Sequence, residues 1–177
     1  NTTEFLENIL QWAQANQGAL PVKFELVQLN QVVANIRDIA LTTFKAKAIA
    51  LEIDMDKNTS VYTDKGLISF ILRNLIFNAF KFSPAHSKVS VKTEVAHGYT
   101  LVKITDSGTG LNKQQIDAFH KGSLNAGLDS TGEKSTGIGL LLCKDFAEKI
   151  NAEISVTSEP NKGSIFSVKI PQKKVAK

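Results

Sequence analysis

Apolar residues along this chain recur with two spacings, one typical of helices and one typical of strands. A spacing of three and four residues predicts helices in the segments 4–16, 31–44, 65–83, 113–119 and 138–150. We expect Asn30 to cap the second helix and Asp64 to cap the third, because such short polar side chains accept a hydrogen bond from an unpaired backbone N–H. Pro84 ends the third helix, since the residue before a proline disfavours the helical conformation.

Elsewhere apolar and polar residues alternate, which predicts β-strands. The strand segments are VKFELVQL, IALEIDMD, SVYT, KVSVKTEV, YTLVKITD, AEISVTS and SIFSVKI. A turn at His97-Gly98 joins one pair as a hairpin, and a turn from Pro160 to Gly163 joins the last pair. Strands cluster in hairpins and helices interrupt them without strict βαβ alternation. We therefore expect an α+β fold, a two-layer α/β sandwich in which helices pack on one face of one mixed sheet.

Composition narrows the classes of function. The chain has 177 residues, 42% of them hydrophobic, which suits one domain with a single core. Its net charge of +4 comes from scattered lysines rather than from a basic block, so we expect no nucleic-acid partner. The lone Cys143 excludes an intrachain disulfide, and no apolar run approaches the ~18 residues that span a bilayer. We expect a cytoplasmic domain and, because the chain begins at Asn1 rather than Met, a fragment of a longer protein.

Three polar residues interrupt the apolar third helix. Asn74, Asn78 and Lys81 are spaced by four and three residues, so they stand above one another on a single stripe. One interpretation is a solvated helix face, or a buried Asn bonded to a neighbouring strand. The other is a stripe that offers two amide oxygens and a cation to a metal–phosphate group. Mg²⁺ suits that arrangement, because it takes few protein ligands beside substrate phosphates.

The segment ITDSGTGL places an acidic residue at the end of an apolar strand. Asp106 is followed by Gly108 and Gly110, which let the backbone turn sharply and approach a ligand closely. A plain strand-to-helix turn is the simpler interpretation. In the functional interpretation, the carboxylate accepts a hydrogen bond from an exocyclic amine such as that of adenine. The spacing does not match the dinucleotide-binding pattern GxGxxG.

The segment GLDSTGEKSTGIGL, residues 127–140, nearly spells the phosphate-binding P-loop GxxxxGK[ST]. Glu133 breaks that spacing, and no buried strand precedes the segment, so we reject a P-loop. The segment runs into the last predicted helix, whose N-terminus is a natural anion site. The connection from His120 to Thr136 is long and poor in apolar residues, which indicates a functional lid or a disordered loop.

In combination, these segments resemble the catalytic ATP-binding domain of sensor histidine kinases, within the larger ATPase family shared with DNA gyrase, the Hsp90 chaperones and MutL. LRNLIFNAFKFSP is similar to the N box, DSGTG to the G1 box and STGIGL to the G2 box, and Phe119 stands where the F-box aromatic is expected. SEPNKGSIFSVKIP resembles the family's last hairpin, and ENILQWAQANQG resembles the end of its dimerisation helix pair. The resemblance implies the Bergerat ATP-binding fold. Residues 1–18 would end the dimerisation and histidine-phosphotransfer helix, and residues 19–177 would form the catalytic ATP-binding domain.

The resemblance also implies a site for ATP or ADP with Mg²⁺. Asn78 is expected to bind Mg²⁺ with Asn74 beside it, and Lys81 to contact phosphate, so that Asn78 and Lys81 are the catalytic pair. Asp106 is expected to accept the adenine amino group. Gly108 and Gly110 are expected to lie under the base, and Ser164 to support the adenine end through water. Thr136, Gly137 and Gly139 are expected to form the G2 turn that meets the phosphates. Lys121 and Lys134 are expected contacts from the lid.

Three residues depart from the pattern of that family. Ser135 replaces the Gly usual just before Thr136, which is expected to stiffen the lid hinge and slow closure. Ala152 stands where Gly is common, and Phe82 where Tyr is common; neither is expected to disturb the fold.

A histidine kinase also needs a phosphoacceptor histidine. The chain has three histidines, His86, His97 and His120, and none lies on a predicted amphipathic helix beside an acidic residue. We expect a monomeric fragment, the catalytic part of a protein-histidine kinase. Its acceptor would lie on the parent's dimerisation domain, a response regulator would act downstream, and the parent's membrane anchorage stays open. Two alternatives remain: an anti-sigma-type serine kinase of the same ATPase family, and a non-catalytic nucleotide-binding interaction module.

Overall fold

The computed structural model describes residues 21–122 and 138–172. Its helices are α2 Leu29–Thr43, α3 Lys65–Phe82, α4 Lys113–Lys121 and α5 Ile138–Lys149, and a 3-10 turn, η1, spans Lys45–Lys47. Its strands are β1 Phe24–Gln28, β2 Ala50–Asp54, β3 Ser60–Asp64, β4 Lys88–Ala96, β5 Tyr99–Thr105, β6 Glu153–Glu159 and β7 Gly163–Pro171. Each of these helices and strands falls on a segment that the hydrophobic pattern predicts. The predicted helix 4–16 lies outside the described residues.

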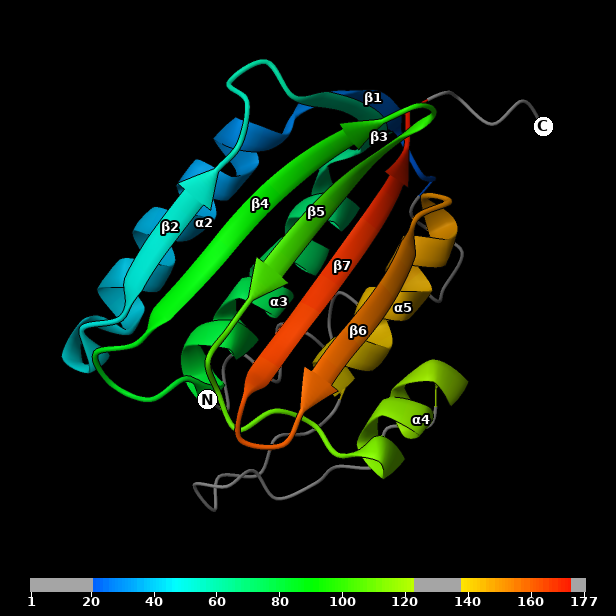
Figure 1. The fold of residues 1–177 in the computed structure, drawn as a ribbon. Helices are drawn as coiled ribbons and strands as arrows, with labels where there is room; N and C mark the ends of the chain where they lie inside the picture. The colour runs from blue at the N-terminus through cyan, green and yellow to red at the C-terminus, as the bar shows by residue number, and fades with distance from the viewer. Residues whose placement is uncertain (1–20, 123–137, 173–177) are drawn as a thin grey trace.

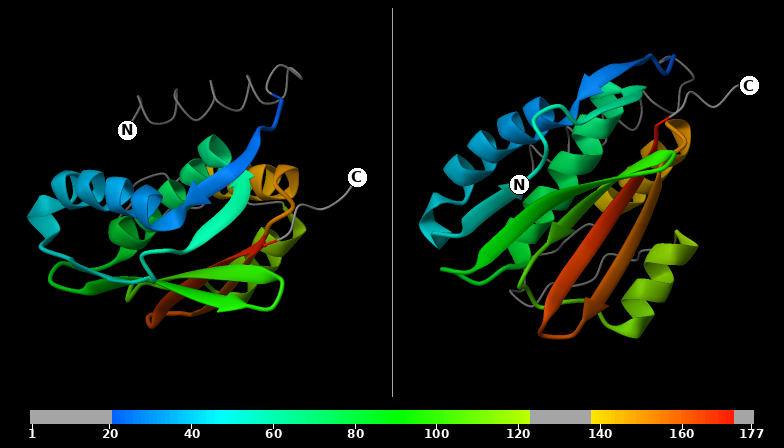
Figure 2. Two further views of the ribbon diagram at one scale, coloured as in Figure 1. Left: turned by 90° about the horizontal axis from the view of Figure 1, so that it is seen from above. Right: turned by 45° about the horizontal axis from the view of Figure 1, so that its top comes forward.

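The elements form two layers. One layer is a sheet with the strand order β2-β4-β5-β7-β6, and helices α2, α3 and α5 cover one of its faces (Figure 1). Figure 2 shows the two layers from above, with the helices together on one side of the sheet. The short helix α4 packs beside the edge strand β6. Among the described helices, none is both long and apolar enough to cross a membrane.

The five-stranded sheet is mixed, as expected from the sequence. Strand β2 runs parallel to β4, and the other neighbouring pairs are antiparallel. Strands β1 and β3 do not join this sheet but form a separate antiparallel pair of their own. Because β1 leads directly into α2 and β3 directly into α3, this pair lies on the helical side of the molecule (Figure 2). The expectation of a mixed sheet with helices on one face is confirmed, and the second ladder is an addition to it.

Helix α3 packs against the sheet with a fully buried apolar face. The residues of this face with no exposed surface are Ile68, Ile71, Leu72, Leu75 and Ile76. They join inward-facing residues of the central strands in one hydrophobic core: Val89, Val91, Val102, Ile104, Val168 and Ile170. Burial of each such side chain contributes about 1.5–3 kcal/mol, so packing rather than helix propensity fixes the position of α3.

The two predicted helix caps have different outcomes. Asp64 caps α3, since its Oδ1 accepts a hydrogen bond from the backbone N–H of Leu67 at 3.0 Å. The prediction for Asn30 is wrong, because α2 begins at Leu29, directly after β1. The Leu29 N–H donates instead to the carbonyl oxygen of Thr59 at 3.0 Å. A backbone bond from a distant segment therefore replaces the side-chain cap that local sequence suggests.

The end of α5 explains why Ala152 is tolerated. The residue with left-handed backbone there is Asn151, with φ of 57°, and Asn adopts this conformation more readily than most residues. Ala152 follows it and donates its N–H to the carbonyl oxygen of Ala147 at 2.8 Å. A glycine at position 152 is therefore not required.

Candidate functional site

The polar stripe of α3 lies at the border of the core. Asn74, Asn78 and Lys81 are all half-buried. The amide nitrogen of Asn74 donates to the Phe70 carbonyl of its own helix at 3.3 Å, so this Asn does not bond a strand. A Cβ added to Gly139 would lie 2.5 Å from Asn74 Oδ1, which means that the first turn of α5 rests directly on the Asn74 side chain.

Asn78 and Lys81 follow on the last turns of α3. The Asn78 amide makes no hydrogen bond with any described residue, so its oxygen can accept a ligand from outside the protein. Lys81 Nζ lies 5.6 Å from the centroid of the Phe82 ring. Phe82 thus provides an aromatic face for the lysine where the family often has Tyr.

Asp106 directly follows strand β5 and is 7% exposed. Its Oδ1 accepts the N–H of Gly108 at 2.8 Å and the N–H of Ser164 at 3.3 Å. Its Oδ2 accepts no hydrogen bond from the described residues. Burial raises the pKa of the Asp106 carboxyl above its ordinary value, although the two backbone N–H groups act in the opposite direction. The chain thus holds a desolvated carboxylate with one oxygen available at the end of a strand.

Glycines let three backbone segments meet around Asp106. A Cβ on Gly108 would lie 2.8 Å from Asp106 Oδ1 and 2.8 Å from the Phe82 carbonyl oxygen. Gly110 and Gly163 both have positive φ, of 66° and 92°. A Cβ on Gly110 would overlap the Glu159 carbonyl, and one on Gly163 would overlap the Asp106 carbonyl. The turn after β5 is therefore in direct backbone contact with the turn between β6 and β7.

A pair of serines supports this contact. Ser158 Oγ accepts the N–H of Leu111 at 2.7 Å, and it lies 2.8 Å from the Gly163 carbonyl oxygen and 2.9 Å from Ser164 Oγ. Because a carbonyl only accepts, the Ser158 proton is assigned to Gly163, and the Ser164 hydroxyl then donates to Ser158. Lone pairs of Ser164 Oγ remain for another donor. The sequence analysis selected Ser164 but missed Ser158. Ser158 lies opposite Ser164 in the β6–β7 hairpin, and this pairing is the signal that could have identified it.

The remaining predicted site residues have different positions. Lys134, Thr136 and Gly137 lie outside the described residues, as does Ser135. Lys121 is exposed at the end of α4. The predicted F-box aromatic, Phe119, is 1% exposed, and its ring packs edge-on against Phe166.

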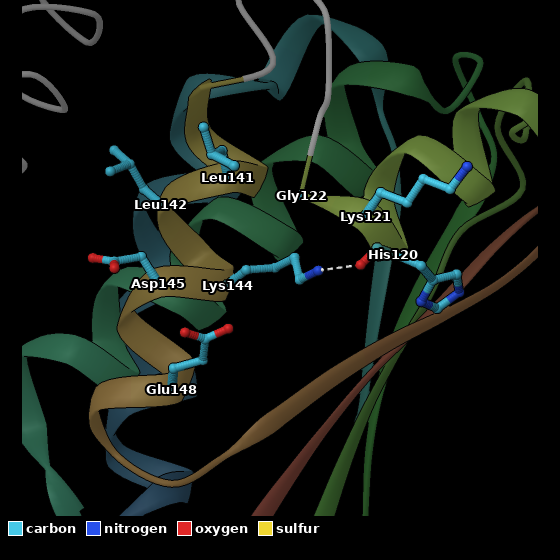
Figure 3. A pocket seen from close by; sticks show the side chains of 8 residues that line it. All are labelled: His120, Lys121, Gly122, Leu141, Leu142, Lys144, Asp145 and Glu148. Carbon is cyan, nitrogen blue, oxygen red and sulfur yellow. Dashed lines mark hydrogen bonds between the residues drawn. The ribbon is translucent and has the colours of Figure 1, made fainter.

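A separate hollow of about 440 Å³ lies between the end of α4 and α5 (Figure 3). Lys144 crosses from α5 to α4, and its Nζ donates to the carbonyl oxygens of Phe119 and His120 at 2.9 and 2.8 Å. The hollow is lined by His120, Lys121, Gly122, Leu141, Leu142, Lys144, Asp145 and Glu148. No residue of α3 or of the Asp106 turn lines it, so it is distinct from the candidate site.

The fold is thus a two-layer sandwich with a buried carboxylate after a strand, close-approach glycines beside it and an amide–lysine stripe on helix α3. Residues 63–174 match the family described as histidine kinase-, DNA gyrase B- and HSP90-like ATPase, and the chain belongs to this family. It is the ATP-binding catalytic domain of the sensor histidine kinase type, as the sequence predicted.

Known relatives support this assignment. The chain is 35% identical over 127 residues to the sensor protein BceS of Halalkalibacterium halodurans, a match that covers 71% of the chain and 37% of BceS. It is 29% identical over 177 residues to the autoinducer 2 sensor kinase/phosphatase LuxQ of Vibrio vulnificus, covering 96% of the chain and 21% of LuxQ. The chain thus spans less than half the length of these curated relatives.

Solved structures share the fold. The histidine kinase AdeS of Acinetobacter baumannii superposes with a TM-score of 0.76 at 22% identity, covering 97% of this chain and 79% of AdeS. The catalytic domain of histidine kinase ThkA gives 0.75 at 19% identity, covering 86% and 99%. Full-length ShkA in complex with AMPPNP gives 0.78 at 18% identity, covering 98% and 36%.

The contact between the two turns predicts a specific effect of Gly163→Ala. Its Cβ would overlap the Asp106 carbonyl, so we expect the β6–β7 turn to move away from Asp106 and nucleotide affinity to fall by more than about tenfold, or 1.4 kcal/mol. Gly98→Ala is the matched control, because Gly98 has a similar φ of 89° but nothing within 4 Å of its added Cβ. Both variants place a Cβ at a similar positive φ, so equal nucleotide affinities by calorimetry would contradict the role of the contact.

The raised pKa of Asp106 predicts that Asp106→Asn stabilises the ligand-free domain at neutral pH. A carboxyl whose pKa is raised on folding favours the folded state below its unfolded pKa, and this contribution is lost as the pH rises through the folded pKa. Removing the charge should therefore raise the melting temperature at pH 7–8, and the gain should vanish as the pH falls towards the ordinary value of 3.8.

Asp56→Asn is the control for that measurement. Asp56 is exposed, yet it accepts the N–H of Asn58 two residues ahead at 2.8 Å, the same local bond that Asp106 makes with Gly108. A melting temperature that rises equally in both variants, or falls in Asp106→Asn at pH 7–8, would contradict burial as the cause.

Proposed function

We propose that this domain binds Mg·ATP between the polar stripe of α3 and the Asp106 turn, and orients the γ-phosphoryl group for transfer to a histidine. The observation that carries the proposal is the buried Asp106 carboxylate, whose Oδ1 is held by two backbone N–H groups and whose Oδ2 stays available. A family of ATPases supplies the ligand class.

Adenine fits the Asp106 end of the site. Its exocyclic amine is a donor, and Oδ2 is an acceptor with no competing partner among the described residues. Gly108 lets the backbone pack directly against the carboxylate, since an added Cβ would lie 2.8 Å from both Asp106 Oδ1 and the Phe82 carbonyl oxygen. The lone pairs of Ser164 Oγ can accept a bridging water there.

The α3 stripe fits the phosphate end. The Asn74 amide nitrogen donates to the Phe70 carbonyl, and its Oδ1 lies so close to Gly139 that an added Cβ would be 2.5 Å away, whereas the Asn78 amide makes no hydrogen bond with the described residues. Asn78 is therefore the proposed Mg²⁺ ligand and Lys81 the proposed phosphate contact, with Asn74 as the residue that positions α5. When bound, Mg²⁺ supplies neutralisation of phosphate charge.

Transfer in such a site depends on positioning and charge neutralisation rather than on covalent chemistry of the protein. The chain's three histidines, His86, His97 and His120, are all exposed. His86 and His97 lie outside helices, and His120 lies in the last turn of α4 and lines the separate hollow, which no residue of α3 lines. We infer that the acceptor belongs to the dimerisation domain of the parent, that a response regulator acts downstream, and that this fragment is a monomer.

Base specificity tests the proposal. Guanine places an acceptor oxygen where adenine places its amine, so the Asp106 carboxylate would lose one charge-assisted hydrogen bond and face an oxygen instead. We expect Mg·GTP to bind roughly ten- to a hundredfold more weakly than Mg·ATP, from the ~1.5–3 kcal/mol of such a bond. Calorimetric titration of both nucleotides measures the ratio.

Asp106→Asn provides the control for base specificity. The amide nitrogen of Asn can donate to the guanine oxygen, so the preference for ATP should shrink or reverse in this variant. Equal affinity of the unmutated chain for the two nucleotides would contradict the assignment of Asp106 to the base.

A further inference from the structure

Lys47 connects η1 to the far end of α3, although no motif of the sequence includes it. Its ammonium nitrogen donates to three backbone carbonyl oxygens, those of Phe80 at 3.1 Å, Lys81 at 2.5 Å and Ser83 at 3.0 Å. An ammonium has three N–H donors, and all three are used. The side chain is half-buried, so these bonds are partly shielded from water.

These three carbonyls are groups that a helix end normally leaves unpaired. Many helices close their last turn with a left-handed glycine. Helix α3 does not, because its C-cap Ser83 is extended, with φ of −75° and ψ of 142°, and Pro84 follows. The positive charge of Lys47 instead lies at the negative end of the α3 dipole, where a cation is stabilising.

Two residues that adjoin the Lys47 backbone have a left-handed conformation. Ala48 has φ of 48°, in the left-handed region that residues other than Gly seldom occupy, and His86 has φ of 61°, in the same region, where His is found more often than most residues. The N–H of His86 donates to the carbonyl oxygen of Lys47 at 2.8 Å. Strained residues persist where the surrounding structure requires them, and the strained Ala48 directly follows Lys47.

The last turn of α3, whose carbonyl oxygens accept from Lys47, forms one end of the proposed nucleotide site. Lys81 belongs to it, Asn78 lies one turn earlier, and the Phe82 carbonyl oxygen lies where a Cβ on Gly108 would be only 2.8 Å away. We propose that Lys47 is a positioning residue for the nucleotide site, which fixes the last turn of α3 and so sets Asn78 and Lys81 against the Asp106 turn. This inference rests on the proposed function above.

Mg²⁺-dependent ADP binding to the whole chain tests the inference. In Lys47→Met, which keeps the length of the side chain without its donors, we expect Mg·ADP to bind about tenfold more weakly, equal to 1.4 kcal/mol. The enhancement of ADP affinity by Mg²⁺ should also fall, because Asn78 and Lys81 serve the metal–phosphate end. Hydrogen exchange at the Ser83 amide, which donates to Ala79 at 3.2 Å, should become faster. Titrations run well below the melting temperature keep both proteins folded.

Lys45→Met is the matched control. Lys45 lies in the same short turn and is exposed, and its side chain makes no interaction with the described residues, so its Mg·ADP affinity should equal that of the unmutated chain. If Lys47→Met does not fold, Lys47→Gln, which keeps two N–H donors on a shorter arm, should show a smaller loss in the same direction.

Each outcome has a defined meaning. A weaker Mg²⁺ enhancement in Lys47→Met, with Lys45→Met unchanged, supports the inference. A lower melting temperature with unchanged Mg·ADP affinity, or an equal loss with and without Mg²⁺, overturns it, since a purely structural lysine would behave in that way. No ADP binding by the unmutated chain would instead overturn the proposed function, and the inference with it.

Discussion

Helix α3 is buried along one whole face, and the rest of the structure depends on that burial. Its apolar residues pack on the sheet, α2 and α5 pack against its flanks, and β3 leads directly into it through the Asp64 cap. The helical period then places Asn74, Asn78 and Lys81 along the border of the buried face. The packing that stabilises the domain thus also orients one end of the candidate site.

At the other end of the site, the buried Asp106 carboxylate destabilises the folded domain when no ligand is bound. Asp106 is desolvated, and its two backbone N–H partners only partly offset the loss of water, which is why its pKa is raised. The Gly110 and Gly163 contacts keep the two turns closed around it. A ligand that donates to Oδ2 would relieve this cost, so affinity for an amine-bearing base and reduced stability of the empty domain have the same origin.

The sequence predicts the positions of residues correctly where the signal is local. The α3 stripe, the Asp106 turn, the Asp64 cap and the mixed α+β sandwich follow from spacing and turn chemistry over a few residues. The prediction fails where a contact with a distant segment of the chain determines the local structure. Asn30 is not a cap because Thr59 supplies a backbone acceptor, β1 and β3 form their own ladder, and Ser158 matters only through its register with Ser164. Lys47 is another such case, since its three acceptors lie more than thirty residues away along the chain. Periodicity and motif spacing carry no information on such pairings.

The central claim is that α3 and the Asp106 turn together form one Mg·nucleotide site. A calorimetric titration of ADP with and without Mg²⁺, on the unmutated chain and on Asp106→Ala, tests this claim most directly. We expect ADP to bind the unmutated chain, Mg²⁺ to strengthen this binding, and Asp106→Ala to weaken it at least about tenfold with Mg²⁺ present. Equal affinity of the two proteins for ADP, or no binding by the unmutated chain, would contradict it.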